Sequence, residues 1–456
     1  MNSRLTQWSC LVLFILGVQL RAGAQPPPPP VEFNSEPAQL APQSAGPVVS
    51  PETPGTAGAS SYYGNESGPV GYEENSYADY GPAQRGLLRR RGVLAGGAAG
   101  GLLAGLPSGW TEFDVLAWWH KGRQIQPLLN TSPTGTPIGD AAVIGTTGTT
   151  ALFGNDKYGE DIRAGGRVNL GLWLDGDSSI GIGNRLTSVA GDDITYDNQS
   201  NGTEILGRPF FNVLLNDRDA LLLSYPGEFS GEFHATSSTN FIMNDFYARL
   251  RMSEDAVNRI DFLIGYEYAR IGDDLIVRSS TTNINALDPA FGVTFDFRDE
   301  FRTVNKFDGV MIGLMGDYVR GRAKVSYLGK LGYGNLDERL IINGTGSASA
   351  GGASVPLNGG LLALPTNSGT HSWSRPVFVP EVNLNLHLQL TQRLDFSIGY
   401  SFVYFTNVLL AGDQVDRRLN LSQQSGALTG QAFPLPQRNE TDFWYQGLNF
   451  GLNGTF

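Results

Sequence analysis

The sequence has only one cysteine, Cys10, among its 456 residues, and this scarcity excludes several kinds of protein. A disulfide framework and a cysteine-based metal centre both need more thiols. No apolar run reaches the eighteen residues or so that a membrane-spanning helix needs. The 32 Lys and Arg residues are outnumbered by 44 Asp and Glu, and the formal net charge of -12 gives no support for nucleic-acid binding. An acidic surplus of this kind is typical of solvated loops.

The amino end has the pattern of a secretory signal peptide over residues 1–24. Arg4 supplies a positive charge, residues 11–20 are apolar, and Ala22-Gly23-Ala24 offers a cleavage site before Gln25. Cys10 precedes the apolar run, so it cannot serve as a lipid attachment site that follows such a run. Cleavage after Ala24 would remove it. We therefore expect an exported chain without thiols.

Residues 25–109 form a second region, predicted to be a disordered periplasmic linker. Five consecutive prolines at 26–30 favour a polyproline II rod, and the chain stays rich in Pro, Gly, Ser, Glu and Tyr up to about residue 83. Its tyrosines could instead contact a periplasmic partner. Residues 92–106 are glycine-rich and apolar, and they fit either a flexible lead-in or a segment at a membrane surface. The sequence leaves the role of this region open.

The last strand of the chain predicts the fold of the rest. Apolar or small residues alternate with polar ones from Leu448 through Phe450 and Leu452 to Phe456. A closed barrel needs such a strand, because its last strand must pair with its first and leave no open edge. In an outer membrane the apolar face would meet lipid and the polar face the lumen. A soluble β-sandwich with an edge strand is the alternative. We interpret the final Phe456 as a signal for the outer-membrane assembly machinery.

The same alternation recurs along residues 110–456 and predicts an all-β fold, a transmembrane antiparallel up-and-down β-barrel of about ten strands. Short turns and long segments alternate strictly, as periplasmic turns and external loops do. The long segments are expected at 120–160, 189–238, 271–301, 335–376 and 408–440. Apolar runs at 210–213 and 220–223 could add a hairpin and make twelve strands. Trp110 and the Trp118-Trp119 pair lie at the two ends of the first strand and predict two interfacial aromatic girdles.

Several motifs also resemble those of the putative β-barrel porin family of planctomycete bacteria. They are FRTVNKFDG at 301–309, VPEVN at 379–383, GYSF at 399–402, GDQVD at 412–416 and FWYQGL at 443–448, together with WW at 118–119 and GGR at 165–167. The resemblance covers about residues 110–456. It implies an outer-membrane β-barrel that is porin-like, with no substrate attached.

The residues expected to line the lumen are the polar ones between the lipid-facing positions. They are Arg167, Arg249, Arg251, Arg322, Lys324, Lys330, Glu267, Glu381, Asn383, Asn385 and His387, with Asp245 and Asp395 as further acids. We expect passive passage of small solutes or ions through a narrow charged lumen. In the alternative, these charges pair and fill the interior, and the protein is a structural or surface-interaction barrel that acts through its long external loops.

Catalysis and metal binding have weaker support, and we predict no enzyme and no cofactor. His387 lies among Asn385, Ser397 and Ser401, but a lipid hydrolase would favour a site that faces lipid, and no G-x-S-x-G motif is present. The acid pairs at 192–193 and 273–274 lack the spaced oxygen ligands of a calcium loop. The expected partners are outer-membrane lipid and the assembly machinery, and homo-oligomerisation is left open.

Overall fold

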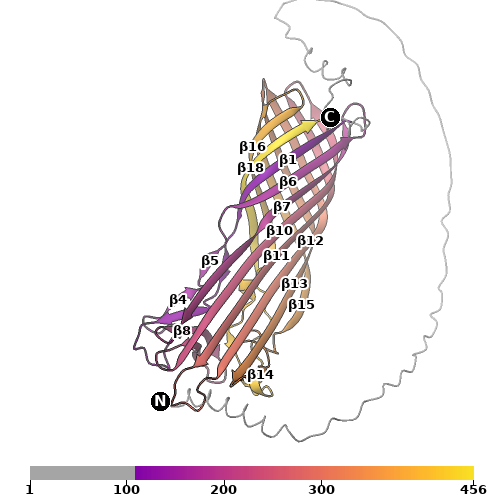
Figure 1. Ribbon diagram of the computed structural model, residues 1–456. Helices are drawn as coiled ribbons and strands as arrows, with labels where there is room; N and C mark the ends of the chain where they lie inside the picture. Colours follow the sequence, from indigo (N-terminus) through magenta and orange to yellow (C-terminus); the bar gives the residue numbers. More distant parts are fainter. Residues whose placement is uncertain (1–107) are drawn as a thin grey trace, which may run out of the picture. The chain divides into compact units, whose positions relative to one another are not determined.

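The computed structural model describes residues 108–456, and these form a closed antiparallel β-barrel (Figure 1). Around the barrel the strands follow the order β1, β6, β7, β10, β11, β12, β13, β15, β16 and β18, and β18 pairs with β1 to close the ring. The predicted all-β barrel of ten strands is therefore confirmed. The signal peptide at 1–24 and nearly all of the linker at 25–109 lie outside the described residues.

The ten wall strands differ greatly in length. They are β1 (Gly109–His120), β6 (Arg163–Trp173), β7 (Ile180–Ser200), β10 (Phe229–Glu254), β11 (Asn258–Asn283), β12 (Thr294–Arg320), β13 (Ala323–Ala350), β15 (Gly369–Gln389), β16 (Leu394–Leu409) and β18 (Glu440–Thr455). No helix among residues 108–456 is long and apolar enough to cross a membrane.

The seam of the barrel joins the first wall strand to the last residue of the chain. The Gly109 amide donates to the Phe456 carbonyl over 3.0 Å, and the Phe456 amide donates back over 3.2 Å. The Phe456 ring lies so close that a Cβ on Gly109 would come within 2.5 Å of it. The seam therefore requires glycine at position 109.

The lipid-facing positions predicted from the alternation point outward as expected. Phe246, Val310, Leu384 and Leu448 all have between 42% and 62% of their surface exposed, whereas their inward neighbours are buried or half-buried. The girdle prediction was wrong for Trp110, which is only 5% exposed because it lies on the inner face of β1. Trp118 and Trp119 were expected to point to opposite faces, and Trp118 is the one buried on the inner face. Trp119 alone of the three points outward, against Tyr400.

The predicted long connections at 120–160 and 408–440 are confirmed, but those at 189–238, 271–301 and 335–376 were too long because their strands continue far past the lipid-facing belt. Strand β12 has 27 residues and β13 has 28. At ~3.4 Å per residue and a tilt of ~40°, a strand of this length rises about 70 Å, against roughly 25 Å for the apolar band of an outer membrane. The segment at 271–301, expected to be a loop, is mostly strand, and only 284–293 connects β11 to β12.

Beyond the belt the apolar residues change sides. On β11 the outward residues Ile264 and Tyr266 are exposed, while further along the strand Leu275 and Val277 point inward and are buried. The half of the barrel beyond the belt, which is drawn at the bottom of Figure 1, is named the upper half. It has a hydrophobic interior and a polar exterior, as a soluble protein has. The short turns at 174–179, 255–257, 321–322 and 390–393 all lie at the opposite end.

A second, smaller sheet packs inside this upper half. It contains β3 (Leu129–Ser132), β4 (Thr150–Phe153), β8 (Ile205–Asn212), β9 (Asp217–Ser224) and β17 (Arg418–Leu419), while β2 (Arg123–Ile125) pairs with β5 (Asp156–Tyr158). The hairpin that could have made twelve wall strands is β8–β9, and it belongs to this sheet and not to the wall. Its Leu206 and Phe210 enter one hydrophobic core with the inner face of the upper strands.

The remaining elements lie at the same end of the barrel. Strand β14 (Ala353–Leu357) extends the hairpin from β13, and a 3-10 turn η1 (Ala411–Gln414) and the short helix α3 (Ser422–Ser425) occupy the connection before β18.

Candidate functional site

The inward side chains of the wall strands fill the lumen of the barrel in layers. The outermost layer, at the short-turn end, is a cavity of about 320 Å³. In its wall the Trp173 ring contacts two guanidinium groups, with Arg249 5.0 Å and Arg259 4.5 Å from the ring centroid. Both guanidiniums pair with the fully buried Asp261.

A layer of buried charges follows. The Lys330 ammonium lies 2.7 Å from Asp245, 3.2 Å from Glu267 and 3.1 Å from Glu381. The Arg185 guanidinium lies 2.5 Å from Glu381 and 3.0 Å from Asp245. The five side chains form one network in which two cations hold three carboxylates.

Part of this network spans the full width of the lumen. In the ring of ten strands β7 is third and β15 eighth, so they stand five places apart, on opposite walls. Arg185 comes from β7 and Glu381 from β15, and their contact of 2.5 Å therefore bridges the diameter.

An apolar layer closes the lumen next to these charges. It takes buried residues from every wall strand except β6. Phe241 of β10 stacks on Tyr445 of β18 with ring centroids 4.5 Å apart, and it meets Phe405 of β16 at 6.0 Å. Strands β10 and β16 are fourth and ninth in the ring, so this contact also joins opposite walls.

Buried ion pairs tie the upper sheet to the wall. Arg123 of β2 contacts Asp273 of β11 at 2.9 Å, and Arg208 of β8 contacts Asp299 of β12 at 2.6 Å. Asp299 also accepts hydrogen bonds from the backbone amides of Leu362 and Ala363, each at 2.8 Å. The acids at 273 and 299 therefore anchor internal segments to the wall.

One acid beside this region has an altered proton affinity. Burial, with a contribution from the Asp273 carboxylate, raises the pKa of Asp413 in η1 to about 6, while Lys121 opposes the change. At the other end of the barrel, hydrogen bonds from Ile180 and Ser179 lower the pKa of Asp175 to about 2. No group of three or more His, Cys, Asp or Glu side chains within 108–456 is arranged to hold a metal ion.

The predicted lumen residues fall into three places. Arg167, Arg249, Lys330, Glu267, Glu381, Asn383 and His387 are buried inside the barrel. Lys324 and Asn385 are half-buried in the wall of the 320 Å³ cavity, with Lys324 3.3 Å from Asp395. Arg251 and Arg322 lie at the short-turn rim, where Arg251 pairs with Glu254 at 2.5 Å and Arg322 is exposed.

The arrangement around His387 does not form a triad. One ring nitrogen lies 2.6 Å from the Ser326 hydroxyl and the other 3.2 Å from the Asn453 amide. Ser401 instead contacts Asn383 and Arg167. The sequence placed His387 and Ser401 on lumen-facing positions of two adjacent strands but could not give their partners.

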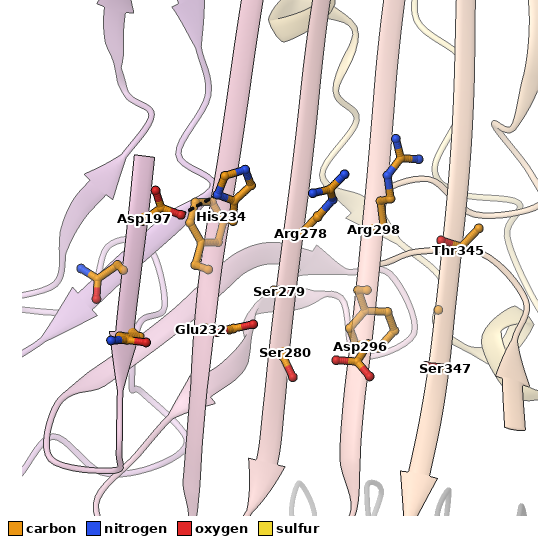
Figure 2. A pocket seen from close by; sticks show the side chains of 15 residues that line it. Asp197, Glu232, His234, Arg278, Ser279, Ser280, Asp296, Arg298, Thr345 and Ser347 are labelled. Atoms are coloured by element: carbon orange, nitrogen blue, oxygen red, sulfur yellow. Dashed lines mark hydrogen bonds and ion pairs between the residues drawn. The ribbon is translucent and has the colours of Figure 1, made fainter. Parts of the chain in front are cut away.

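A second concave site lies on the outer face of the upper wall, where the sequence had predicted loops. It is a groove of about 1060 Å³ across β7, β10, β11, β12 and β13, and Figure 2 shows its charged side chains on neighbouring strands. Sequence reasoning missed it because it followed the outward apolar positions and stopped where these became polar. The inward apolar residues at 275, 277, 295 and 297 carry the signal that the strands continue.

Fold and layered lumen together define an outer-membrane β-barrel with long extramembrane strands. The family model described as "Putative beta barrel porin-7 (BBP7)" matches residues 110–456, and the chain belongs to this family. The resemblance to a putative β-barrel porin family is thereby confirmed, and its planctomycete source stays a prediction.

Solved outer-membrane structures also resemble the chain, at low similarity. The outer membrane protease OmpT from Escherichia coli shares 12% identity at a TM-score of 0.36, covering 76% of this chain and 97% of its own. A FadL homologue from Pseudomonas aeruginosa shares 8% identity at a TM-score of 0.21, covering 76% of this chain and 90% of its own. An anion-selective porin from Comamonas acidovorans shares 8% identity at a TM-score of 0.14, covering 76% of this chain and 100% of its own. With scores this low, none of these likenesses bears on activity or substrate. The curated proteins contain no match.

Proposed function

We propose that this protein is a closed outer-membrane barrel that acts through its extracellular half, as a surface-interaction protein, and does not pass solutes through its lumen. The observation that carries the proposal is the contact between opposite walls, Arg185 with Glu381 and Phe241 with Phe405. Charged and apolar layers that meet across the diameter leave the lumen packed, as expected for a barrel of few strands.

Passive passage through a charged lumen is the competing function. It would require the charged network and the apolar layer to separate together. Such an open state would break the ion pairs of Arg185 and Lys330 and expose the apolar layer to water at the same time, so it would be rare. The porin-like family and fold are compatible with either function, and the packing favours the closed barrel.

The upper half supports the surface role. Its wall strands carry polar residues outward over a continuous hydrophobic core, so that it has the construction of a soluble domain attached to a membrane anchor. We propose no catalytic role, because the His387 ring nitrogens contact Ser326 and Asn453 and no carboxylate within the described chain completes a triad. Export by the signal peptide, recognition of Phe456 by the assembly machinery and association with further copies are also proposals.

Planar-bilayer recording of the full-length protein tests the closed lumen. We expect no conductance steps from protein whose folding is shown by heat-modifiable migration. Discrete steps from wild-type protein would contradict the proposal. A variant with Phe241→Ala and Phe405→Ala weakens the apolar layer, and its matched control is Phe246→Ala with Phe396→Ala, on the lipid-facing side of the same two strands.

Single-cysteine labelling tests which half of the barrel faces outward. The mature chain would contain no cysteine, so Ser347→Cys near the end of β13 and Thr391→Cys in a short turn can each be labelled alone. We expect a membrane-impermeant maleimide to label Ser347→Cys on intact cells and Thr391→Cys only after permeabilisation. The reverse pattern would place the large half of the barrel in the periplasm and overturn the surface role.

A further inference from the structure

The outer groove of about 1060 Å³ lies well above the lipid-facing belt. Tyr268 is the last outward residue of the belt on β11, and Arg278 in the groove follows it by ten residues on the same face. At ~3.4 Å per residue and a tilt of ~40°, that places Arg278 about 26 Å beyond the belt. A ligand in the groove would therefore be bound outside the bilayer.

Strand register lines up the charges of the groove in two rows. The first row crosses five strands through Asp197, His234, Arg278, Arg298 and Thr345, each directly opposite the next. Figure 2 shows these five side chains in sequence across the sheet. Neighbouring strands are ~4.8 Å apart, so the row is about 19 Å long.

The second row lies two residues farther along each strand. It consists of Gln199, Glu232, Ser280, Asp296 and Ser347. Both arginines therefore lie in the first row, which has Asp197 at one end, and the other two acids, Glu232 and Asp296, lie in the second row.

The first row has a deficit of negative charge. Arg278 and Arg298 stand directly opposite each other, and like charges in such a pair repel. Arg298 contacts Glu300 at 2.8 Å, whereas the exposed Arg278 has no carboxylate partner within residues 108–456. His234 lies beside Arg278 and contacts Asp197 at 2.5 Å. An anionic group placed between the two guanidiniums would relieve this repulsion and accept charge-assisted hydrogen bonds from both.

The chemistry of the groove favours a carbohydrate over a peptide. At the groove β10, β11, β12 and β13 are hydrogen-bonded to neighbours on both sides, whereas β7 beyond Val189 pairs with β10 alone. A peptide could therefore extend the sheet only along the edge of β7, beside the groove and not across its face. The outward side chains of the two rows are charged, hydroxyl or amide groups, while Phe233 and Phe297 point inward and are buried. A polyhydroxylated chain can use the hydroxyls and amides, and the acidic row excludes ligands that carry negative charge on both edges.

We propose that this groove binds a linear acidic polysaccharide, with its carboxylate or sulfate groups on the Arg278–Arg298 side and its hydroxyls toward Glu232 and Asp296. The inference rests on the proposed surface function and supplies its ligand class. The first row sets affinity through the two arginines. The second row sets orientation by repelling any anionic group that is turned toward it.

Calorimetric titration of the full-length protein in detergent tests the proposal. The probes are polygalacturonate oligomers, which carry carboxylates, heparin oligosaccharides, which carry sulfates, and neutral dextran. We expect at least one anionic probe to bind and dextran not to bind. The double variant Arg278→Gln with Arg298→Gln should weaken binding by at least about tenfold, the order expected for lost hydrogen bonds between charged groups.

Two further variants separate recognition from a merely structural effect. Arg339→Gln removes an exposed, outward arginine from β13 that lies outside the groove, and it should leave binding unchanged. Glu232→Gln with Asp296→Asn removes the acidic row and should tighten binding of the anionic probes. Loss of a structural element would not improve affinity.

Binding of neither anionic probe, equal binding of dextran, or an unchanged affinity in the double arginine variant would each overturn the proposal. These outcomes are distinct from failure of the proposed function. A silent bilayer without polysaccharide binding would leave the closed surface barrel standing and remove this ligand class, whereas wild-type conductance would contradict the closed barrel itself.

Discussion

Lys330 provides the sharpest test of the packed lumen. Its ammonium is the cation shared by Asp245, Glu267 and Glu381, and the residue is only 5% exposed. Replacing Lys330 by Met keeps most of the side-chain volume but removes the charge. Arg185 still neutralises two of the three acids, so Glu267 loses its one cation partner in the network.

The expected loss follows from this charge balance. Leaving a buried charge unpaired typically costs about 3–5 kcal/mol. We expect Lys330→Met to lower the free energy of unfolding by about 3 kcal/mol, which is more than a hundredfold in the unfolding equilibrium. Adding Glu267→Gln should restore part of the loss, because the uncompensated carboxylate is then gone.

The matched control is Lys324→Met, on the same strand and facing the same lumen. Lys324 has one partner, Asp395 at 3.3 Å, and both side chains are about one-quarter exposed. Such a pair contributes roughly 0–1 kcal/mol. Urea unfolding of each refolded variant in lipid vesicles, followed by tryptophan fluorescence, measures the difference. Equal midpoints for Lys330→Met and Lys324→Met would refute the assignment of Lys330 as the centre of a buried network.

Three further predictions concern the seam, the internal turn and a tight contact. Deletion of Phe456 removes its two hydrogen bonds to Gly109 and should lower the amount of heat-modifiable, folded barrel in the membrane. Because the folded pKa of Asp413 is raised to about 6, the folded form binds its proton more tightly than the unfolded chain. The free energy of unfolding should therefore fall by about 1–2 kcal/mol, after allowance for solvent screening, as the pH rises from about 4 to about 6, and it should stay level above pH 6. Asp413→Asn should remove this slope in melting experiments. Gly171→Val would place a Cβ 2.0 Å from the Trp110 ring, and overpacking of this kind should cost about 1–3 kcal/mol in urea unfolding.

Two of these predictions have a control variant. Phe450→Ala removes a lipid-facing aromatic residue from β18 and should spare assembly, so equal losses in both variants would speak against a special role for Phe456. Gly166→Val on β6 meets no atom closer than 4.0 Å, and a loss equal to that of Gly171→Val would show that valine itself is poorly tolerated there. If the pH dependence of stability persists in Asp413→Asn, it arises from other titratable groups.

The membrane-embedded half of the fold could be predicted from the sequence because its signal is local. Leu384, Leu386 and Leu388 alternate with polar residues, and the alternation alone fixes which face meets lipid. The same argument placed Lys330 and Glu381 inside. It could not pair Arg185 with Glu381, because these residues are 196 positions apart and meet only when the ring closes.

The upper half was missed for a different reason. The alternation does not stop beyond the belt; it changes phase, so that Phe297 and Leu340 point inward while Arg298 and Arg339 point outward. The outward apolar positions therefore end at the edge of the belt, although the strand itself continues. The groove could not be predicted, because its two rows depend on register across five strands.

This change of phase has a consequence for how the protein sits in its membrane. The backbone of β11 continues from the bilayer into water without a break in its pairing to β10 or β12, and a bulge at this level occurs only in the β7–β10 pair, between Thr239 and Phe241. Along β11 the depth of immersion is therefore set by side chains alone. Converting the first outward polar positions above the belt, such as Asn240 and Asp308, to apolar residues would draw the barrel deeper without altering its fold. Anchor depth and architecture can therefore vary independently in this protein, and a lineage could adjust to a thicker membrane while keeping every strand.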